Sequence, residues 1–169
     1  MYSGIDNLVT VYRDSVQPGM RNLPMYNTAL EVEAVGFEWY QGRLCGVLVT
    51  PWCMNLVLLP GEDDDWTRLA PGKKIKAVFP AGEYLCMLSR VEGIAPHLSL
   101  PLFTTVQDFA DQETARQVAR EVLRQLHQDT TKPVQVDPVD SELERSGLQR
   151  PLSRRGLLRG WFASKQGTA

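Results

Sequence analysis

The chain has 169 residues, of which 43% are hydrophobic and 22% are charged. These proportions are ordinary for a soluble globular protein, and the length suits one domain whose core needs neither a metal nor a disulfide. The formal net charge of -2 argues against general nucleic-acid binding.

The charge is unevenly distributed along the chain. The segment from Glu142 to the end has a net charge of +4, so the preceding 141 residues carry -6. No acidic residue occurs in positions 150–169. A basic tail on an acidic body indicates either an appendage that meets a partner or a solvated segment that aids solubility.

The cysteine pattern and the N-terminus bear on the cellular compartment. Cys45, Cys53 and Cys86 form no CxxC pair, and an odd count without a secretory leader favours a reducing compartment. The first residues have neither the basic nor the apolar region of a signal peptide. No apolar run reaches the roughly 20 residues that span a bilayer. We therefore expect a cytoplasmic protein without membrane insertion.

A short amphipathic helix is predicted over residues 6–16. Its apolar face is formed by Leu8, Val11, Tyr12 and Val16. Asp6 or Asn7 suits the N-cap position, and Pro18-Gly19 ends the helix. Residues 21–28 contain several turn formers and are predicted to form a loop.

Strand patterns dominate residues 30–103. Residues 30–35 alternate between apolar and acidic side chains, which predicts a half-buried strand, and Gln41-Gly42-Arg43 predicts a turn. Further strands are expected at 73–79, 83–91 and 97–103. Pro101 favours an edge position for the last of these, because proline cannot donate to a strand ladder. The acidic run Asp63-Asp64-Asp65 lacks the ligand spacing of a calcium loop and is expected to be solvated.

The most apolar stretch, residues 46–60, is predicted to organise the fold. Its apolar side chains occupy odd and even positions alike, which is typical of a strand covered on both faces. Pro51 interrupts the stretch, so the chain there is either one bent strand or a hairpin. Trp52, Met54 and Asn55 follow the break. They either fill the core or form the wall of a groove that grips another chain.

A longer amphipathic helix is predicted near the C-terminal end of the domain. Its apolar positions follow the helical repeat and are Ala115, Val118, Ala119, Val122, Leu123 and Leu126. Asp111, or Asp108 for an earlier start, suits the N-cap. Residues 130–140 resemble an extended linker. The predicted architecture is an α+β domain over 1–129, with a mainly antiparallel sheet of about five or six strands packed by this helix, followed by a linker and basic tail over 130–169.

Residues that would carry catalysis are scarce. The sequence contains no phosphate-binding glycine loop, nucleophile elbow or zinc-protease motif. A cysteine paired with His97 would give a nucleophile and a base, and that chemistry requires the two to lie within hydrogen-bond reach. We predict a non-enzyme without cofactor or metal. The alternative is a small cysteine-dependent redox or metal-handling protein.

The basic tail contains the most specific local pattern. Ser153-Arg-Arg-Gly-Leu-Leu-Arg159 has the arrangement of a twin-arginine export motif. No apolar region or cleavage site follows it, so it does not fit an export signal. Arg154 and Arg155 suit carboxylates, and Leu157 and Leu158 suit an apolar groove. The alternative is that the pattern arose by chance in an arginine-rich tail.

Several sequence blocks together resemble the HybE family of nickel–iron hydrogenase assembly chaperones, which includes HupJ and HoxT proteins. The blocks are Pro24-Met-Tyr-Asn27, Val32-Glu-Ala-Val-Gly-Phe37, Gly46-Val-Leu-Val-Thr-Pro-Trp52, Met54-Asn-Leu-Val-Leu-Leu-Pro60, Pro80-Ala-Gly-Glu83, Phe109-Ala-Asp-Gln-Glu-Thr-Ala115 and Ser153-Arg-Arg-Gly-Leu-Leu-Arg-Gly160. The resemblance spans about residues 8–160. The chain departs from some relatives, because it lacks the paired CxxC motifs of a fused rubredoxin domain.

The resemblance implies an accessory chaperone in the maturation of a membrane-bound or periplasmic uptake hydrogenase. Such a chaperone binds subunit precursors and delays export until the cofactors are inserted. The implied partners are the small-subunit precursor, with or without its twin-arginine signal peptide, the large subunit, and other maturation factors. The partner-binding positions carried over from the matching blocks are Pro51, Trp52, Met54, Asn55, Arg154, Arg155, Leu157 and Leu158.

Two further hypotheses follow from the tail. In the first, the tail occupies the groove near Pro51 when no client is present, so a client binds by displacing it. In the second, the chain is a general binding module whose basic tail meets an acidic partner or a membrane surface, and raised salt would weaken that contact.

Overall fold

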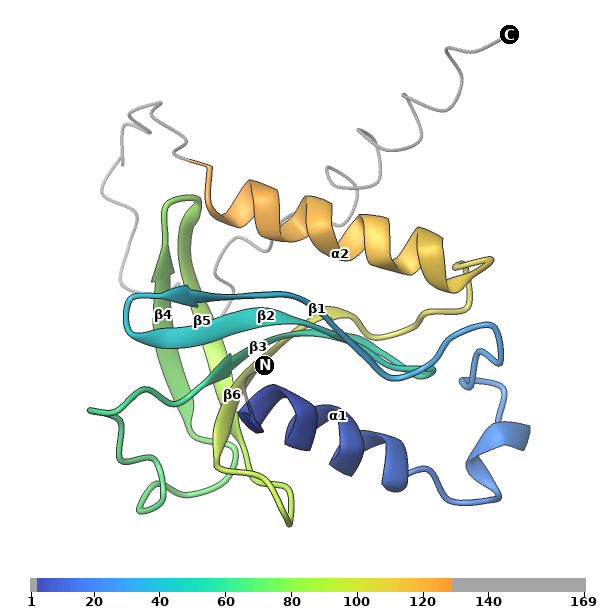
Figure 1. The fold of residues 1–169 in the computed structure, drawn as a ribbon, viewed down its shortest axis with the longest axis horizontal. Coiled ribbons are helices and arrows are strands. Elements are labelled where there is room, and N and C mark those ends of the chain that lie inside the picture. Colours follow the sequence, from blue (N-terminus) through green and yellow to red (C-terminus); the bar gives the residue numbers. More distant parts are fainter. Residues whose placement is uncertain (1–2, 129–169) are drawn as a thin grey trace, which may run out of the picture.

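The structure is a computed structural model that describes residues 3–128, so the predicted linker and the twin-arginine-like motif lie outside the described residues. Figure 1 shows the arrangement of the elements. In chain order they are α1 (Ser3–Asp14), η1 (Met20–Asn22), β1 (Glu33–Tyr40), β2 (Arg43–Val49), β3 (Met54–Leu59), β4 (Lys74–Phe79), β5 (Gly82–Ser89), β6 (His97–Phe103) and α2 (Gln112–Leu126). No helix among the described residues has the length and apolar character that crossing a bilayer demands.

The strands form one six-stranded sheet in the order β1-β2-β3-β6-β5-β4. Every neighbouring pair is antiparallel. Helix α2 lies on one side of the β1–β2–β3 part of the sheet and α1 lies on the other (Figure 1). The predicted α+β class, the antiparallel sheet and its strand number are confirmed.

The central apolar stretch is a hairpin, not one bent strand. β2 and β3 pair from Leu44 opposite Leu59 to Val49 opposite Met54, and residues 50–53 connect them. Because side chains alternate along a strand, Val47 faces the core under α2 while Leu48 faces α1. Coverage by a helix on each face explains why apolar residues occur at successive positions.

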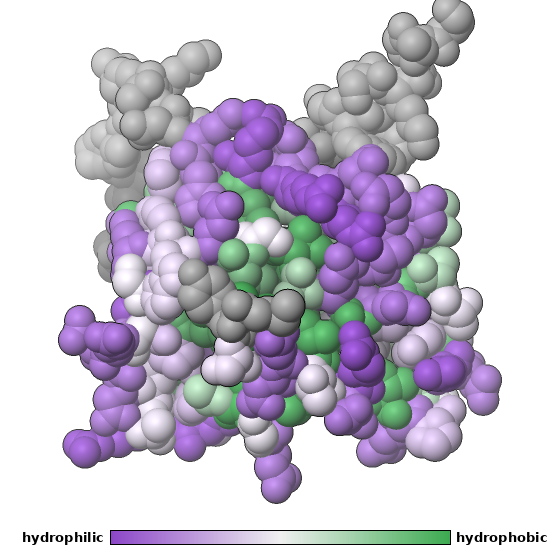
Figure 2. Space-filling view, viewed as in Figure 1, coloured by the Kyte–Doolittle hydropathy of each residue, from purple (hydrophilic) through white to green (hydrophobic). Residues whose placement is uncertain are grey.

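Helix α2 matches its prediction closely. All six predicted apolar positions are buried. The Asp111 carboxylate accepts a hydrogen bond from the Thr114 amide at 2.7 Å, as an N-cap does. Its outer face is strongly hydrophilic, as the upper part of Figure 2 shows. Two of its arginines there pair with acids one turn away, Arg116 with Glu113 and Arg124 with Glu121.

Helix α1 begins earlier than predicted, so neither Asp6 nor Asn7 is its N-cap. Asp6 lies in the first turn, where a carboxylate interacts favourably with the helix dipole. The Asn7 side chain instead donates to the Gly93 carbonyl at 2.6 Å. The helix extends toward its N-terminus because Ile5 packs against the apolar cluster on this face of the sheet, around Leu8.

The first strand also differs from its prediction. It starts at Glu33 and runs to Tyr40, beyond the alternating pattern at residues 30–35. A bulge between Val35 and Glu38 breaks the alternation, and Gly36 at φ 63° provides it. The predicted turn into β2 is confirmed: Gln41 and Gly42 both have positive φ, as a two-residue hairpin turn requires.

The prediction that Pro101 places the last strand at a sheet edge is wrong. β6 lies between β3 and β5. Its pairing with β5 covers only His97, Leu98 and Ser99, and beyond Met87 the rest of β5 pairs with β4 alone, so Pro101 lies past the end of the β5–β6 ladder. A proline is therefore accommodated in a strand that is interior by topology.

The acidic loop after β3 is not simply solvated. The Asp64 carboxylate receives two hydrogen bonds from the Arg43 guanidinium, each 2.6 Å long, and a third from the Gly61 amide at 2.9 Å. These contacts hold the pKa of Asp64 below its ordinary value. The loop is thus tied to the start of β2.

Candidate functional site

Three segments distant in sequence meet at one end of the sheet. They are residues 20–30 after α1, the β2–β3 connection at 50–53, and the residues that precede α2. They lie together at the right of Figure 1. The residues carried over from the family resemblance, as far as the structure describes them, lie in or next to the second segment.

The β2–β3 connection is fixed by Thr50. Its amide donates to the Cys53 carbonyl at 2.9 Å, and its hydroxyl accepts from the Cys53 amide at 3.0 Å. Thr50 is fully buried, and these bonds satisfy its amide and its hydroxyl. Pro51 and Trp52, which lie between these two residues, are therefore held in a defined turn.

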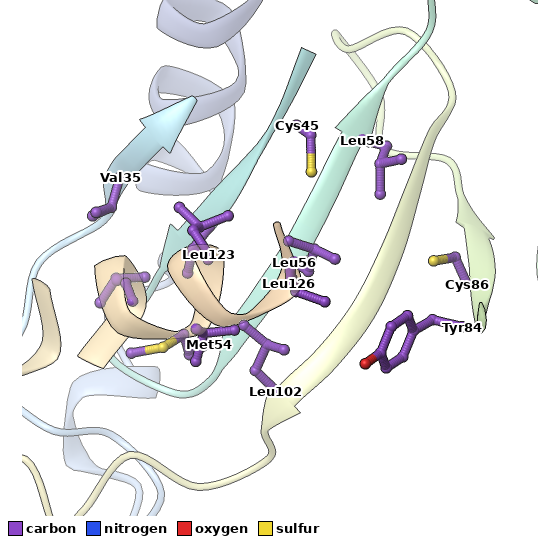
Figure 3. Packing of buried hydrophobic residues seen from close by; sticks show 14 of the residues in the cluster. Val35, Cys45, Met54, Leu56, Leu58, Tyr84, Cys86, Leu102, Leu123 and Leu126 are labelled. Atoms are coloured by element: carbon purple, nitrogen blue, oxygen red, sulfur yellow. The ribbon is translucent and has the colours of Figure 1, made fainter. Parts of the chain in front are cut away.

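Of the four predicted positions in this block, Pro51 and Met54 are buried, whereas Trp52 and Asn55 are half-buried. Met54 is fully buried in the core under α2, which Figure 3 shows, so it holds the core together and does not line a groove. Asn55 points to the opposite face of β3 and donates to the Cys53 sulfur at 3.6 Å. Trp52 is half-buried on that same face. Its ring lies 6.3 Å from the ring of Tyr26.

Asn27 connects the three segments, and its role was not visible in the sequence pattern. Its amide donates to the Pro51 carbonyl at 2.7 Å. Its side chain donates to the carbonyls of Val106 and Phe109 at 2.9 and 2.8 Å and accepts from the Ala29 amide at 3.0 Å. One residue thus ties the β2–β3 connection to the start of the α2 region. The only sequence signal was its place in the first resemblance block.

A pocket of about 310 Å³ opens beside Pro51. Tyr26 and Pro51 contribute apolar lining, and Arg13, Arg21 and Glu31 contribute charge. The guanidinium groups of Arg13 and Arg21 make no ion pair or side-chain hydrogen bond within residues 3–128. The pocket therefore has charged groups available to a ligand.

Exposed apolar side chains accompany the pocket. Leu23 is 45% exposed and Met25 is 58% exposed, and both belong to the segment that carries Arg21 and Tyr26. Large apolar side chains are usually buried, so their exposure in one short segment marks a surface suited to another chain. We call Leu23 and Met25, together with the half-buried Tyr26 and Trp52 and with Pro51, which is buried but lines the pocket, the loop surface.

Burial disfavours the thiolate form of all three cysteines. Burial raises the pKa of Cys45 to about 12 and that of Cys86 to about 11, and it also raises the pKa of Cys53. Reactive thiols need the opposite shift. All three cysteines are free, and the described part of the chain has no group of three or more histidine, cysteine or acidic side chains placed to hold a metal.

His97 is fully buried and lies beneath α1. One ring nitrogen, Nδ1, lies 3.2 Å from the Ala95 carbonyl oxygen, and Nε2 lies 3.4 Å from the Tyr12 hydroxyl. If Nδ1 donates to the carbonyl, Nε2 accepts from Tyr12, and both nitrogens are satisfied by a neutral ring. Burial lowers the pKa of His97 accordingly. This histidine fastens α1 to the sheet.

Comparison with known proteins identifies the family. The model described as NiFe-hydrogenase assembly, chaperone, HybE matches residues 4–160. The chain belongs to the HybE family. The expected family is thereby confirmed, and with it the general role of a hydrogenase assembly chaperone.

Relatives and a solved structure agree with the HybE assignment. The chain is 36% identical to the hydrogenase expression/formation protein HupJ of Bradyrhizobium diazoefficiens, over 96% of this chain and 90% of that protein. It is 40% identical to HoxT of Azotobacter vinelandii, over 83% and 84% respectively. The solution structure of HybE from Escherichia coli has the same fold, with a TM-score of 0.59 at 17% identity, covering 82% of this chain and 88% of that one.

One HybE-family relative is much longer. The probable rubredoxin HupJ of Rhodobacter capsulatus is 40% identical over 72% of this chain, but the match spans only 44% of that protein. The chain thus spans less than half the length of that relative.

Proposed function

We propose that this chain acts in the cytoplasm as a non-catalytic chaperone that binds a hydrogenase subunit precursor and delays its export until the cofactors are inserted. The loop surface is the proposed contact, together with Asn55 behind it. The single observation that carries this assignment is the Asn27–Pro51 hydrogen bond of 2.7 Å, which brings two blocks of family resemblance to one surface. Other maturation factors are further partners in this scheme.

The physical properties of the loop surface support client binding. Its exposed apolar side chains gain free energy when another chain covers them. The turn beneath them is held by Thr50 and Asn27, so little conformational entropy is lost on binding. The raised thiol pKa values argue against the alternative of a cysteine-dependent redox protein.

The tail forms the second part of the proposal. Arg154, Arg155, Leu157 and Leu158 are proposed to contact the partner, on the strength of their sequence pattern alone. A tail that blocks the groove would make truncation after Asp140 tighten client binding, whereas a tail that contacts the client would make truncation weaken it. We expect weaker binding, because the arginines in the pocket beside Pro51 would repel those of the tail.

A cellular experiment tests the delay of export. In a bacterium with an exported nickel–iron hydrogenase, the gene for this chain is deleted and the exported small subunit is isolated and assayed for iron–sulfur clusters and for bound large subunit. Without the chaperone we expect incompletely assembled small subunit outside the cytoplasm, and restoration by the wild-type gene. An unchanged composition of the exported enzyme would contradict the proposal.

A further inference from the structure

The charges that line the pocket beside Pro51 indicate what kind of segment it takes. Two arginines and one glutamate face it, which gives the lining a net positive charge. This is opposite to the net charge of -2 for the whole chain. A positive pocket on an acidic body concentrates negative charge at one place.

The two arginines differ from most others in the described fold. Arg43, Arg116 and Arg124 are each paired with an acid of their own chain. Arg13, in the last turn of α1, and Arg21, in η1, have no such partner within residues 3–128. Both side chains are exposed and can be reached by an incoming carboxylate. Because neither has an ion-pair partner among the described residues, such a contact breaks no existing pair.

The apolar neighbours of these arginines define the rest of the ligand. Tyr26 and Pro51 line the same pocket, and Met25 is exposed next to Tyr26 in the chain. A guanidinium group recognises a carboxylate through directed hydrogen bonds, while a tyrosine ring and a proline ring contact apolar side chains. The lining therefore matches a peptide in which an acid adjoins a large apolar residue.

We propose that Arg13 and Arg21 bind the side-chain carboxylate of an acidic–apolar peptide segment, with Tyr26 and Pro51 against its apolar residue. The inference rests on the proposed function in one respect, namely that a hydrogenase subunit precursor supplies the segment. It excludes a twin-arginine sequence, whether from a signal peptide or from the chain's own tail, as the occupant of this pocket.

The test uses the full chain and short overlapping peptides that cover both hydrogenase subunit precursors, signal peptide included. Binding is followed by NMR through the backbone amide shifts of Arg21, Tyr26 and Thr28, which line the pocket. Peptides that shift these amides should contain Asp or Glu beside a large apolar residue. Replacing that acid by Asn or Gln should abolish the shifts.

Charge variants of the chain test the sign of the charge that the pocket binds. Arg21→Glu, and Arg13→Glu in a second variant, should each weaken peptide binding about tenfold, the effect expected for loss of a charge-assisted hydrogen bond. Glu31→Gln should leave binding unchanged or tighten it, because it removes a repelling charge. Arg120→Glu, a reversal on the exposed face of α2, is the matched control and should have no effect.

The outcomes separate this inference from the proposed function. The inference would be overturned if peptides with paired arginines bound the chain and the Glu31→Gln variant bound them more weakly. So would precursor peptides that bind while the pocket amides stay unshifted, although the chaperone function would then stand. If acidic–apolar peptides of unrelated proteins bind the pocket and no precursor peptide does, the pocket chemistry stands and the choice of client falls.

Discussion

The backbone amide of Asn27 lies 2.7 Å from the carbonyl oxygen of Pro51, and this bond joins the segment after α1 to the β2–β3 connection. The side chain of the same asparagine reaches the carbonyls of Val106 and Phe109. Asn27 therefore joins the three segments that meet at the loop surface, alongside the Thr50 contacts that hold the β2–β3 connection. The exposed apolar side chains of the loop surface are held in place by polar contacts beneath them.

Replacing Asn27 by Ala should destabilise the protein by about 1–3 kcal/mol, because the carbonyls of Val106 and Phe109 lose their donor. The free energy of unfolding from urea denaturation measures the effect. Asn22→Ala is the matched control, since Asn22 is exposed and its side chain makes no hydrogen bond to another described residue. Equal stability of the two variants would refute the connecting role of Asn27.

Replacing Asp64 by Asn should also destabilise the fold, by about 1–2 kcal/mol. The change removes the charge that holds the Arg43 guanidinium through two 2.6 Å bonds, at a carboxylate that is only 12% exposed. The neighbouring Asp63→Asn variant, at an exposed position, should be close to neutral. If thermal or urea denaturation ranks the two variants equally, the acidic loop is solvated after all.

The pH dependence of stability should include a contribution from the protonation of the buried His97. Its pKa lies below the ordinary value of 6.5 in the folded chain, so the unfolded chain binds more protons as the pH falls through this range. Stability is therefore full above about pH 6.5 and declines on acidification toward the lower folded pKa. The lowered pKa values of Glu33, Asp64 and Glu121 act at more acidic pH.

A His97→Gln variant separates this contribution from that of the acids. It should lose the decline just below pH 6.5 and keep the decline at more acidic pH. Denaturant unfolding at a series of pH values measures both. A variant that follows the wild-type curve throughout would show that His97 is not the group responsible.

Much of this fold is predictable from sequence because local patterns determine it. The helical repeat of α2 specified all six buried positions, and Asp111 marked its start. The sequence pattern wrongly placed β6 at a sheet edge, because a proline such as Pro101 does not indicate which strands lie beside its own. It also gave Met54 and Asn55 one role, although the two lie on opposite faces of β3.

The contacts of the candidate site could not be predicted for a related reason. Asn27 reaches Val106 and Phe109 across 79 and 82 positions of sequence. No periodicity records such pairings. Family resemblance marked the segments that we propose as the site, and the structure shows how two of them meet.

Met25→Asp tests the loop surface in client binding. Met25 is 58% exposed, so the change should scarcely alter stability but should weaken binding of a subunit precursor about tenfold or more, because a charge must be desolvated in the contact. Met87→Asp, at a methionine on β5 that is 45% exposed, is the matched control. Equal loss of affinity in both variants would place the contact elsewhere.

The most direct test of the central claim is titration calorimetry of the full chain against the hydrogenase small-subunit precursor and, separately, the large-subunit precursor. The small-subunit titration is run with and without the signal peptide. We predict saturable binding to at least one precursor, and weaker binding by the Met25→Asp variant. Binding that survives removal of the signal peptide would place recognition on the body of the client. Absence of binding to both precursors would contradict the account.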